Sequence, residues 1–320
     1  MKRKKIALLG ALVLLALFPF AGATFYTELV TKMMILAIFA LSLDLIVGYT
    51  GLVSFGHAAF YGVGAYTLAL LAPRYDAANL WLTLPAAIVV AGLAALAVGA
   101  FVIRVKGIYF IMVTLAFAQM FYFVFHDTKF GRGSDGISMN FKPVASIAGF
   151  TPFDLGSATH VYYFVFVAML AVFLFLRVLL RSAFGRALQG IRSNEHRMRS
   201  LGFPVYRYKL ASFAIAGALA GLAGYLSAMQ FGFVNPELLS WQQSGNVLLM
   251  LILGGLGSLY GGVVGAFAFV ALEEIYSSLT THWQLLLGGT IIALVIFLPG
   301  GLASLASRFQ RNLVGEPEDE

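Results

Sequence analysis

Cysteine is absent from this 320-residue sequence, and charged residues are scarce. Without cysteine the chain has no disulfide framework, no thiolate nucleophile and no cysteine-based metal site. Only 11% of the residues are charged, whereas 60% are hydrophobic. Water would not tolerate so much exposed apolar surface, so the composition predicts a polytopic, all-α membrane protein. The net charge of +7 then reflects membrane topology rather than nucleic-acid binding, because the aromatic residues lie inside apolar runs.

Sequence motifs for catalysis and nucleotide binding are also absent. The GxxxxGK[ST] pattern that would bind ATP does not occur, and neither does the HExxH or the GxSxG pattern. We therefore expect no catalytic residue, no metal site and no cofactor in this chain. The five histidines, which show no metal-ligand spacing, lie at positions 57, 126, 160, 196 and 282.

Apolar stretches long enough to cross a membrane, which takes about 20 helical residues, recur along the chain. Two further stretches, 48–72 and 244–272, are rich in glycine and fit a simple span less well. Together they predict one membrane domain over 1–320, with about 8–10 transmembrane helices that include broken or re-entrant segments. The clear candidate spans are 6–23, 29–47, 80–103, 107–126, 161–180, 210–230 and 284–304.

The N-terminal sequence MKRKKIALLGALVLLALFPFAGATF has two interpretations. Its basic start, apolar core and Ala21-Gly22-Ala23 are typical of a signal peptide with a cleavage site. Alternatively it is a retained first transmembrane helix that also directs insertion, and we favour this because further spans follow. Thr24 would lie outside in either case.

Lysine and arginine are distributed unevenly among the connecting segments, and this predicts the orientation. In one of the two possible orientations of the spans, 16 of the 21 Lys and Arg residues lie in the cytoplasm. Both termini and a tail over 305–320 then lie in the cytoplasm as well. The loop 127–160 then lies outside, as a folded element that receives a partner or gates the pore, or as a plain connection. The cytoplasmic basic segments are 2–5, 104–106, 177–209 and 308–311.

Residues 244–272 pose a topological puzzle, because the flanking segments 231–243 and 273–283 contain no Lys or Arg and so look external. The 29 residues between them are too few for two spans and too many for one. A broken or re-entrant hairpin fits, with its turn in GGLGSLYGG over 254–262. Irregular backbone at membrane depth needs protein or a wet cavity around it, so this turn should line a pathway or pack in the interior.

The glycine-rich stretch GYTGLVSFGHAAFYGVGAY, over 48–66, has similar chemistry. Broken helices often mark a transporter's pathway, although such glycines can also merely let helices approach closely. Asp44 faces the pathway, forms a structural ion pair, or caps backbone N–H groups of the following segment. His57 is either a proton relay or a neutral histidine hydrogen-bonded in a helix contact. The predicted pathway residues are Asp44, Ser54, His57, Ser134, Asp135, Gly255 and Ser258.

The basic segment 181–209 carries six Arg, one Lys and a single acid, Glu195. Ser193 or Asn194 is a plausible helix N-cap, and Glu195 is favourable next to it because of the helix dipole. Gly202 is a plausible C-terminal stop, which predicts a short helix over EHRMRSLG.

This short helix is expected to be amphipathic, with Met198 and Leu201 on one face. It either docks into a groove on a soluble partner or lies on anionic membrane lipid.

The sequence resembles a known family at these residues, the permeases of ABC importers for branched-chain amino acids, specifically the LivM-type subunit. The resemblance implies a non-catalytic, pore-forming subunit of the bacterial inner membrane that imports Leu, Ile or Val by alternating access. It also implies a second related permease, two cytoplasmic ATP-binding subunits and a periplasmic substrate-binding protein. The matching motifs are GYTGLVSFGHAAFYGVGAY (48–66), GRGSDGI (131–137), GRALQGIRSNEHRMRSLGFPVYRYKL (185–210), AGLAGYL (220–226), GGLGSLYGGVVGA (254–266) and FLPGGL (297–302).

In that family the cytoplasmic segment supplies a coupling helix that inserts into the ATPase. Four positions depart from the usual pattern: Arg132, His196 and Met198 replace small residues, and Gly262 replaces a common proline. The resemblance assigns coupling to Arg192, Glu195, Arg197, Arg199 and Gly202.

Two alternatives concern the substrate and the energy source. Related permeases of the same architecture import urea or short amides. An ion-driven transporter would need carboxylates at the membrane midplane, for which Asp44 is a poor sole candidate. An integral membrane enzyme would need a catalytic set, which the sequence does not offer.

Overall fold

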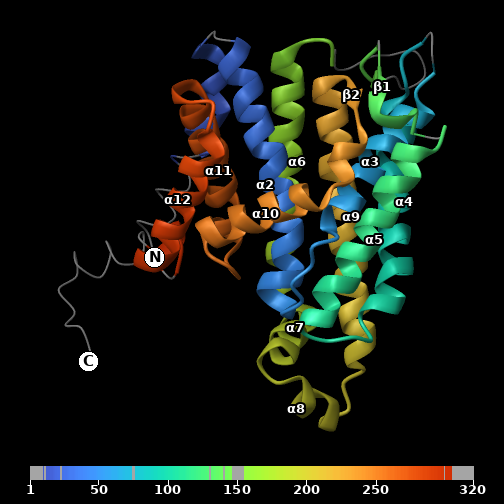
Figure 1. The fold of residues 1–320 in the computed structure, drawn as a ribbon, viewed down its shortest axis with the longest axis vertical. Helices are drawn as coiled ribbons and strands as arrows, with labels where there is room; N and C mark the ends of the chain where they lie inside the picture. Colours follow the sequence, from blue (N-terminus) through green and yellow to red (C-terminus); the bar gives the residue numbers. More distant parts are fainter. Residues whose placement is uncertain are drawn as a thin grey trace.

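The computed structural model describes residues 10, 12–21, 24–73, 76–129, 131–139, 141–145, 155–298 and 300–304. Within this part of the chain nearly all regular structure is helical, as predicted (Figure 1). Six helices of the described residues are long and apolar enough to cross a membrane. They are α2 (Thr24–Thr50), α4 (Leu80–Val102), α5 (Ile108–Asp127), α6 (Ala158–Arg181), α9 (Val205–Phe231) and α11 (Leu259–Leu279).

The remaining elements are shorter. Two of them, α3 (His57–Leu71) and α12 (Trp283–Phe297), are apolar helices below the length of a full span. The other helices are η1 (Phe18–Ala21), η2 (Gly133–Asp135), α7 (Ala183–Ser193), α8 (Glu195–Ser200), η3 (Pro236–Leu239) and α10 (Trp241–Gly254), and the strands are β1 (Ile137–Ser138) and β2 (Phe233–Val234).

Most predicted spans agree with these helices to within a few residues. The span predicted over 284–304 is the main exception, because α12 ends at Phe297, just ahead of the helix-breaking sequence Pro-Gly-Gly. Of the span predicted over 6–23, residues 10 and 12–21 are described, and they are helical over 12–17 and continue into η1. Residues 6–9, 11, 22 and 23, which include most of the possible cleavage site, lie outside the described residues, as does the tail 305–320.

Helix α2 runs through the centre of the bundle and is almost entirely buried, and α9 is mostly buried beside it. Helices α4, α5, α6 and α11 are exposed over most of their surface, and their exposed side chains are largely apolar, as in Leu82, Met112 and Val167. An apolar outer surface of this kind suits lipid or another membrane subunit.

Glycines bring α3 and α9 into close contact. A Cβ atom added at Gly64 would overlap the backbone of Gly221, and one added at Gly224 would overlap the backbone of Tyr61. Contacts between small residues allow this approach, which here replaces the interdigitation of large side chains.

Both glycine-rich stretches form broken spans. After α2, residues 51–56 are not helical, and α3 begins only at His57. In the second stretch, α10 ends at Gly254 and α11 begins at Leu259, so the predicted turn within 254–262 is correct. Gly255 (φ 110°) and Gly257 (φ 77°) adopt backbone conformations that favour glycine. Helix α10 lies across the bundle instead of along it (Figure 1).

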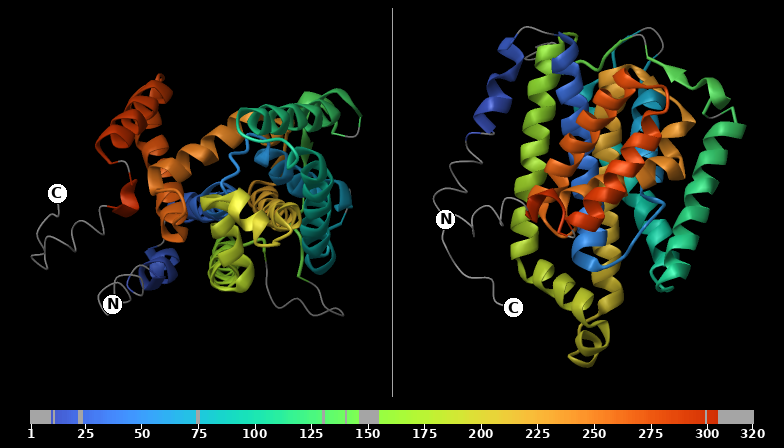
Figure 2. Two further views of the ribbon diagram at one scale, coloured as in Figure 1. Left: turned by 90° about the horizontal axis from the view of Figure 1, so that it is seen from below. Right: turned by 60° about the vertical axis from the view of Figure 1, so that its left-hand side comes forward.

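The two ends of the bundle differ. At one end, β1 pairs antiparallel with β2, so that Ile137 lies opposite Val234 and the loop after α5 joins the connection after α9. This loop is thus folded in its described part. At the other end, α7 and α8 protrude beyond the long helices (Figures 1 and 2). We call these the β1–β2 end and the α7–α8 end.

Candidate functional site

Helix α8 begins and ends at residues with the expected capping chemistry. The Asn194 side chain accepts a hydrogen bond from the backbone N–H of Arg197 at 2.9 Å, which satisfies one free N–H of the first turn. Beyond Ser200, Gly202 has φ of 85°, and Phe203 N–H donates to the carbonyl of Met198 at 3.1 Å. This is a Schellman stop, which suits glycine. The predicted short helix is therefore confirmed, with Asn194 as its N-cap.

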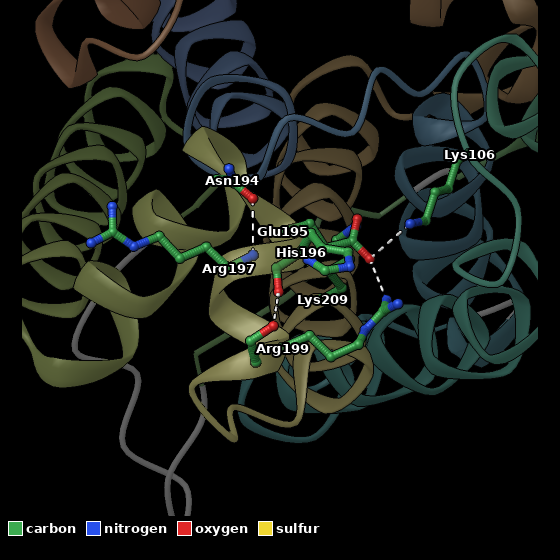
Figure 3. A network of polar contacts seen from close by, with 8 residues as sticks. Lys106, Asn194, Glu195, His196, Arg197, Arg199 and Lys209 are labelled. Atoms are coloured by element: carbon green, nitrogen blue, oxygen red, sulfur yellow. Dashed lines mark hydrogen bonds and ion pairs between the residues drawn. The ribbon is translucent and has the colours of Figure 1, made fainter.

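Glu195 holds this helix against the bundle. Its carboxylate accepts from Lys209 of α9 at 2.9 Å, from Lys106 before α5 at 3.1 Å and from Arg199 at 2.6 Å (Figure 3). Partial burial raises the pKa of Glu195, but the hydrogen bonds and charges of Lys209 and Lys106 lower it by more, so that the pKa lies below its ordinary value. Glu195 therefore stays ionised and faces inward.

The outer surface of α8 is basic and partly apolar. Arg197 points away from the Glu195 cluster in Figure 3, and His196 is also exposed. Leu201 is 65% exposed and Phe203 is 37% exposed, so apolar surface lies beside these polar groups. Such a surface suits docking to another macromolecule or to a membrane.

Met198 and Leu201, which we expected on one apolar face of α8, differ in exposure: Met198 is half-buried, whereas Leu201 is largely exposed. The Met198 side chain lies against Gly190 of α7, close enough that a Cβ atom at Gly190 would be 2.8 Å from its sulfur.

Arg192 belongs to a different group of residues from the other predicted coupling residues. At the end of α7, its guanidinium donates to the carbonyl of Gly48 on α2 and lies near Gly257 of the α10–α11 turn. Asp44, fully buried on α2, accepts a hydrogen bond from Gly257 N–H at 2.9 Å. Arg192, Asp44 and Gly257 thus connect α7, α2 and the turn.

The predicted pathway residues fall into three separate groups. Asp44, Gly255 and Ser258 meet at the α10–α11 turn, where Ser258 caps α11 and borders a cavity of about 350 Å³. Ser134 and Asp135 lie in η2, at the β1–β2 end.

Ser54 and His57 form the third group, at the start of α3. The hydroxyl of Ser54 accepts from Gly56 N–H at 3.2 Å. His57 is fully buried, lies 2.8 Å from the Ser42 hydroxyl and stacks on Phe39. This environment favours a neutral histidine in a helix contact over a proton relay.

A second cavity, of about 440 Å³, lies toward the β1–β2 end. One side of it is apolar, with Ile35, Leu36 and Leu238. Its polar residues are Lys32, Tyr61, Ser227, Asn235 and Gln243.

Comparison with known proteins assigns the chain to a family. The family model described as "Branched-chain amino acid transport system / permease component" matches residues 25–296. The chain is 34% identical to the high-affinity branched-chain amino acid transport system permease protein LivM of Escherichia coli K12, over 94% of this chain and 75% of that protein. The chain belongs to this permease family.

Two further relatives of the permease differ in coverage. This chain is 24% identical to the branched-chain amino acid permease LivH of Salmonella typhimurium, over 83% of this chain and 90% of LivH. A xylose transport system permease, XylH of Escherichia coli K12, is 32% identical over 37% of this chain and 32% of XylH. No solved structure matched. Together with its six apolar helices, family membership makes the chain a multi-pass inner-membrane protein of a transport system.

The four residues that depart from the usual family pattern have defined positions in the structure. Arg132 has φ of 58°, a left-handed conformation that a non-glycine residue rarely adopts. Gly262 lies within α11, where an added Cβ would make only ordinary contacts with Leu251 and Leu41. Met198 packs on α7, and His196 remains on the outer surface of α8.

The residues around the 440 Å³ cavity were not among the predicted pathway residues of the permease. Lys32 is one of the five Lys and Arg residues outside the predicted cytoplasmic segments; it lies eight residues into α2 and pairs with Glu273 of α11 at 3.4 Å. The sequence did carry a signal for this pair, because both charges lie within apolar helices, where ionisable residues are rare and mark functional sites.

Proposed function

We propose that this permease forms the membrane pathway of an ATP-driven importer for branched-chain amino acids and has no catalytic activity of its own. The observation that carries the proposal is α8, a capped helix that the Glu195 cluster holds at one end while its basic and apolar surface stays free. Family membership and the similarity to LivM support the substrate class.

The proposed orientation puts the α7–α8 end in the cytoplasm, together with both termini. Arg181, Arg186, Arg197, Arg199 and Arg207 lie at that end, and positively charged connections favour the cytoplasmic side. The β1–β2 end would then face the periplasm.

The proposed assembly contains a second related permease, two cytoplasmic ATP-binding subunits and a periplasmic binding protein. A LivH-like protein is a reasonable partner, because the permease is similar to both LivM and LivH, which are named for the same kind of transport system. The ATP-binding subunits would receive α8, and the binding protein would deliver substrate at the β1–β2 end.

The proposed coupling has two routes out of the α7–α8 segment. Glu195 joins α8 to α9 and to the segment before α5 through Lys209 and Lys106. Arg192 of α7 donates a hydrogen bond to the Gly48 carbonyl of α2. It also lies near Gly257 of the α10–α11 turn, whose N–H donates to Asp44. A displacement of α7–α8 by the ATPase would therefore reach both the bundle and the broken hairpin.

Charge reversal on the free surface of α8 tests this proposal. In the complete importer reconstituted in liposomes, Arg197→Glu should reduce ATP-dependent leucine uptake by roughly tenfold or more, as for a charge at the centre of an interface. Its assembly into the membrane and its melting temperature should stay unchanged, because Arg197 lies outside the Glu195 cluster.

The matched control is Arg104→Glu, an exposed charge reversal at the same end but off α8. Equal uptake by the wild type and Arg197→Glu would contradict the coupling role. Uptake of urea in place of leucine by the wild type would support the alternative substrate class.

A further inference from the structure

The Lys32–Glu273 pair lies within the membrane-spanning part of the permease. At about 1.5 Å per residue, Lys32 is roughly 12 Å from the start of α2, and Glu273 is roughly 9 Å from the end of α11. Charges at such depth are costly against lipid and so face protein or a wet cavity. The Lys32 and Glu273 side chains are 34% and 28% exposed, and Lys32 lines the 440 Å³ cavity.

This pair has unused hydrogen-bonding capacity. A lysine ammonium has three donors and a carboxylate has about four acceptor positions, but the two groups share a single contact of 3.4 Å. Within the described residues neither side chain has another ion-pair partner. The pair therefore offers one positive and one negative group to a ligand that carries both charges.

Lys32 lines the cavity, whereas Glu273 is not a lining residue and lies beside the cavity through its contact with Lys32. The other lining residues match the remaining parts of such a ligand. Ile35, Leu36 and Leu238 provide an apolar wall, and the Tyr61 hydroxyl, hydrogen-bonded to Ser227, provides a neutral polar group. A volume of about 440 Å³ lies within the usual range for small-molecule pockets, roughly 300–1,000 Å³.

We propose that this cavity is a transient binding site for a zwitterionic amino acid with an aliphatic side chain. Lys32 binds its carboxylate, Glu273 binds its ammonium group, and the apolar wall receives its side chain. The inference rests on the proposed import function and deepens it. A neutral substrate such as urea has no use for this charge pair.

The test uses the complete importer in proteoliposomes, with its binding protein at saturation and labelled leucine as the probe. Lys32→Gln and Glu273→Gln should each lower the maximal uptake rate by roughly 10- to 100-fold, as expected for a lost hydrogen bond to a charged group. Glu274→Gln, next to Glu273 on α11, and Lys129→Gln, exposed at the β1–β2 end, are matched controls that should transport like the wild type.

The exchanged double variant Lys32→Glu/Glu273→Lys separates ligand binding from a structural ion pair. It should restore thermal stability to the wild-type value but not leucine uptake, because the ligand's charges would be mismatched while its side chain occupies the apolar wall. Restored uptake would overturn the site, as would wild-type rates in both single variants. A wild-type complex that fails to transport leucine would instead contradict the proposed function.

Discussion

Glu195 and the Lys32–Glu273 pair show two ways of placing charge in the same permease. Glu195 has three cationic partners at 2.6–3.1 Å, one of them the nearly buried Lys209. Lys32 and Glu273 have a single contact of 3.4 Å beside a cavity. The first arrangement over-determines the position of one carboxylate, whereas the second leaves both charges able to form new bonds.

The difference fits the two roles that we propose for these charges. A helix that transmits force has to move with the bundle, so its contacts should be numerous and mutually supporting. A site that binds and releases a substrate has to exchange partners, so its contacts in the empty state should be few. Numerous contacts hold α8, and few hold Lys32.

Removing Lys209 should break the first arrangement and have the larger effect on structure. Lys209→Met keeps the apolar stem but removes a charged hydrogen bond worth about 1.5–3 kcal/mol, so the amide hydrogens of α8 should exchange roughly 10- to 100-fold faster. The measurement is hydrogen exchange of the purified permease followed by mass spectrometry.

A matched comparison is Lys32→Met/Glu273→Leu, which replaces the whole second pair by apolar groups. Such replacements are often neutral or stabilising, so exchange should stay the same throughout α2 and α11. If this variant loosened its helices as much as Lys209→Met loosens α8, the two arrangements would not differ as described.

Acidification should loosen α8 by a smaller amount than the Lys209→Met substitution. Because the folded pKa of Glu195 lies below its ordinary value of 4.5, its ionisation stabilises the fold fully above that value. This stabilisation is lost as the pH falls below 4.5 and through the folded pKa. Exchange of α8 amides, corrected for intrinsic pH effects, should therefore accelerate below pH 4.5 in the wild type. The acceleration should be absent in Glu195→Gln, and its persistence there would assign it to another group.

Local chemistry explains why much of the fold and α8 itself could be predicted from the sequence. Long apolar runs define the spans, and the glycines over 254–262 define the break between α10 and α11. Asn194 and Gly202 act within one turn of α8, so capping rules are sufficient to predict its ends.

The remaining features depend on residues far apart in the chain. Lys32 and Glu273 are 241 residues apart, and Glu195 at the start of α8 meets Lys106 in the segment between α4 and α5. Neither pairing follows from spacing along one helix. The position of Met198 depends on the space left by Gly190, which only the packing of α7 against α8 reveals.

The central claim, that α8 docks into an ATP-binding subunit, can be tested by cross-linking. The natural chain has no cysteine, so a photoreactive group on Ser200→Cys, exposed on α8, would be the only thiol adduct in this subunit. In the assembled importer it should cross-link to the ATP-binding subunit, whereas the same label on Thr128→Cys at the β1–β2 end should not. Cross-linking from position 128 and none from position 200 would contradict the account.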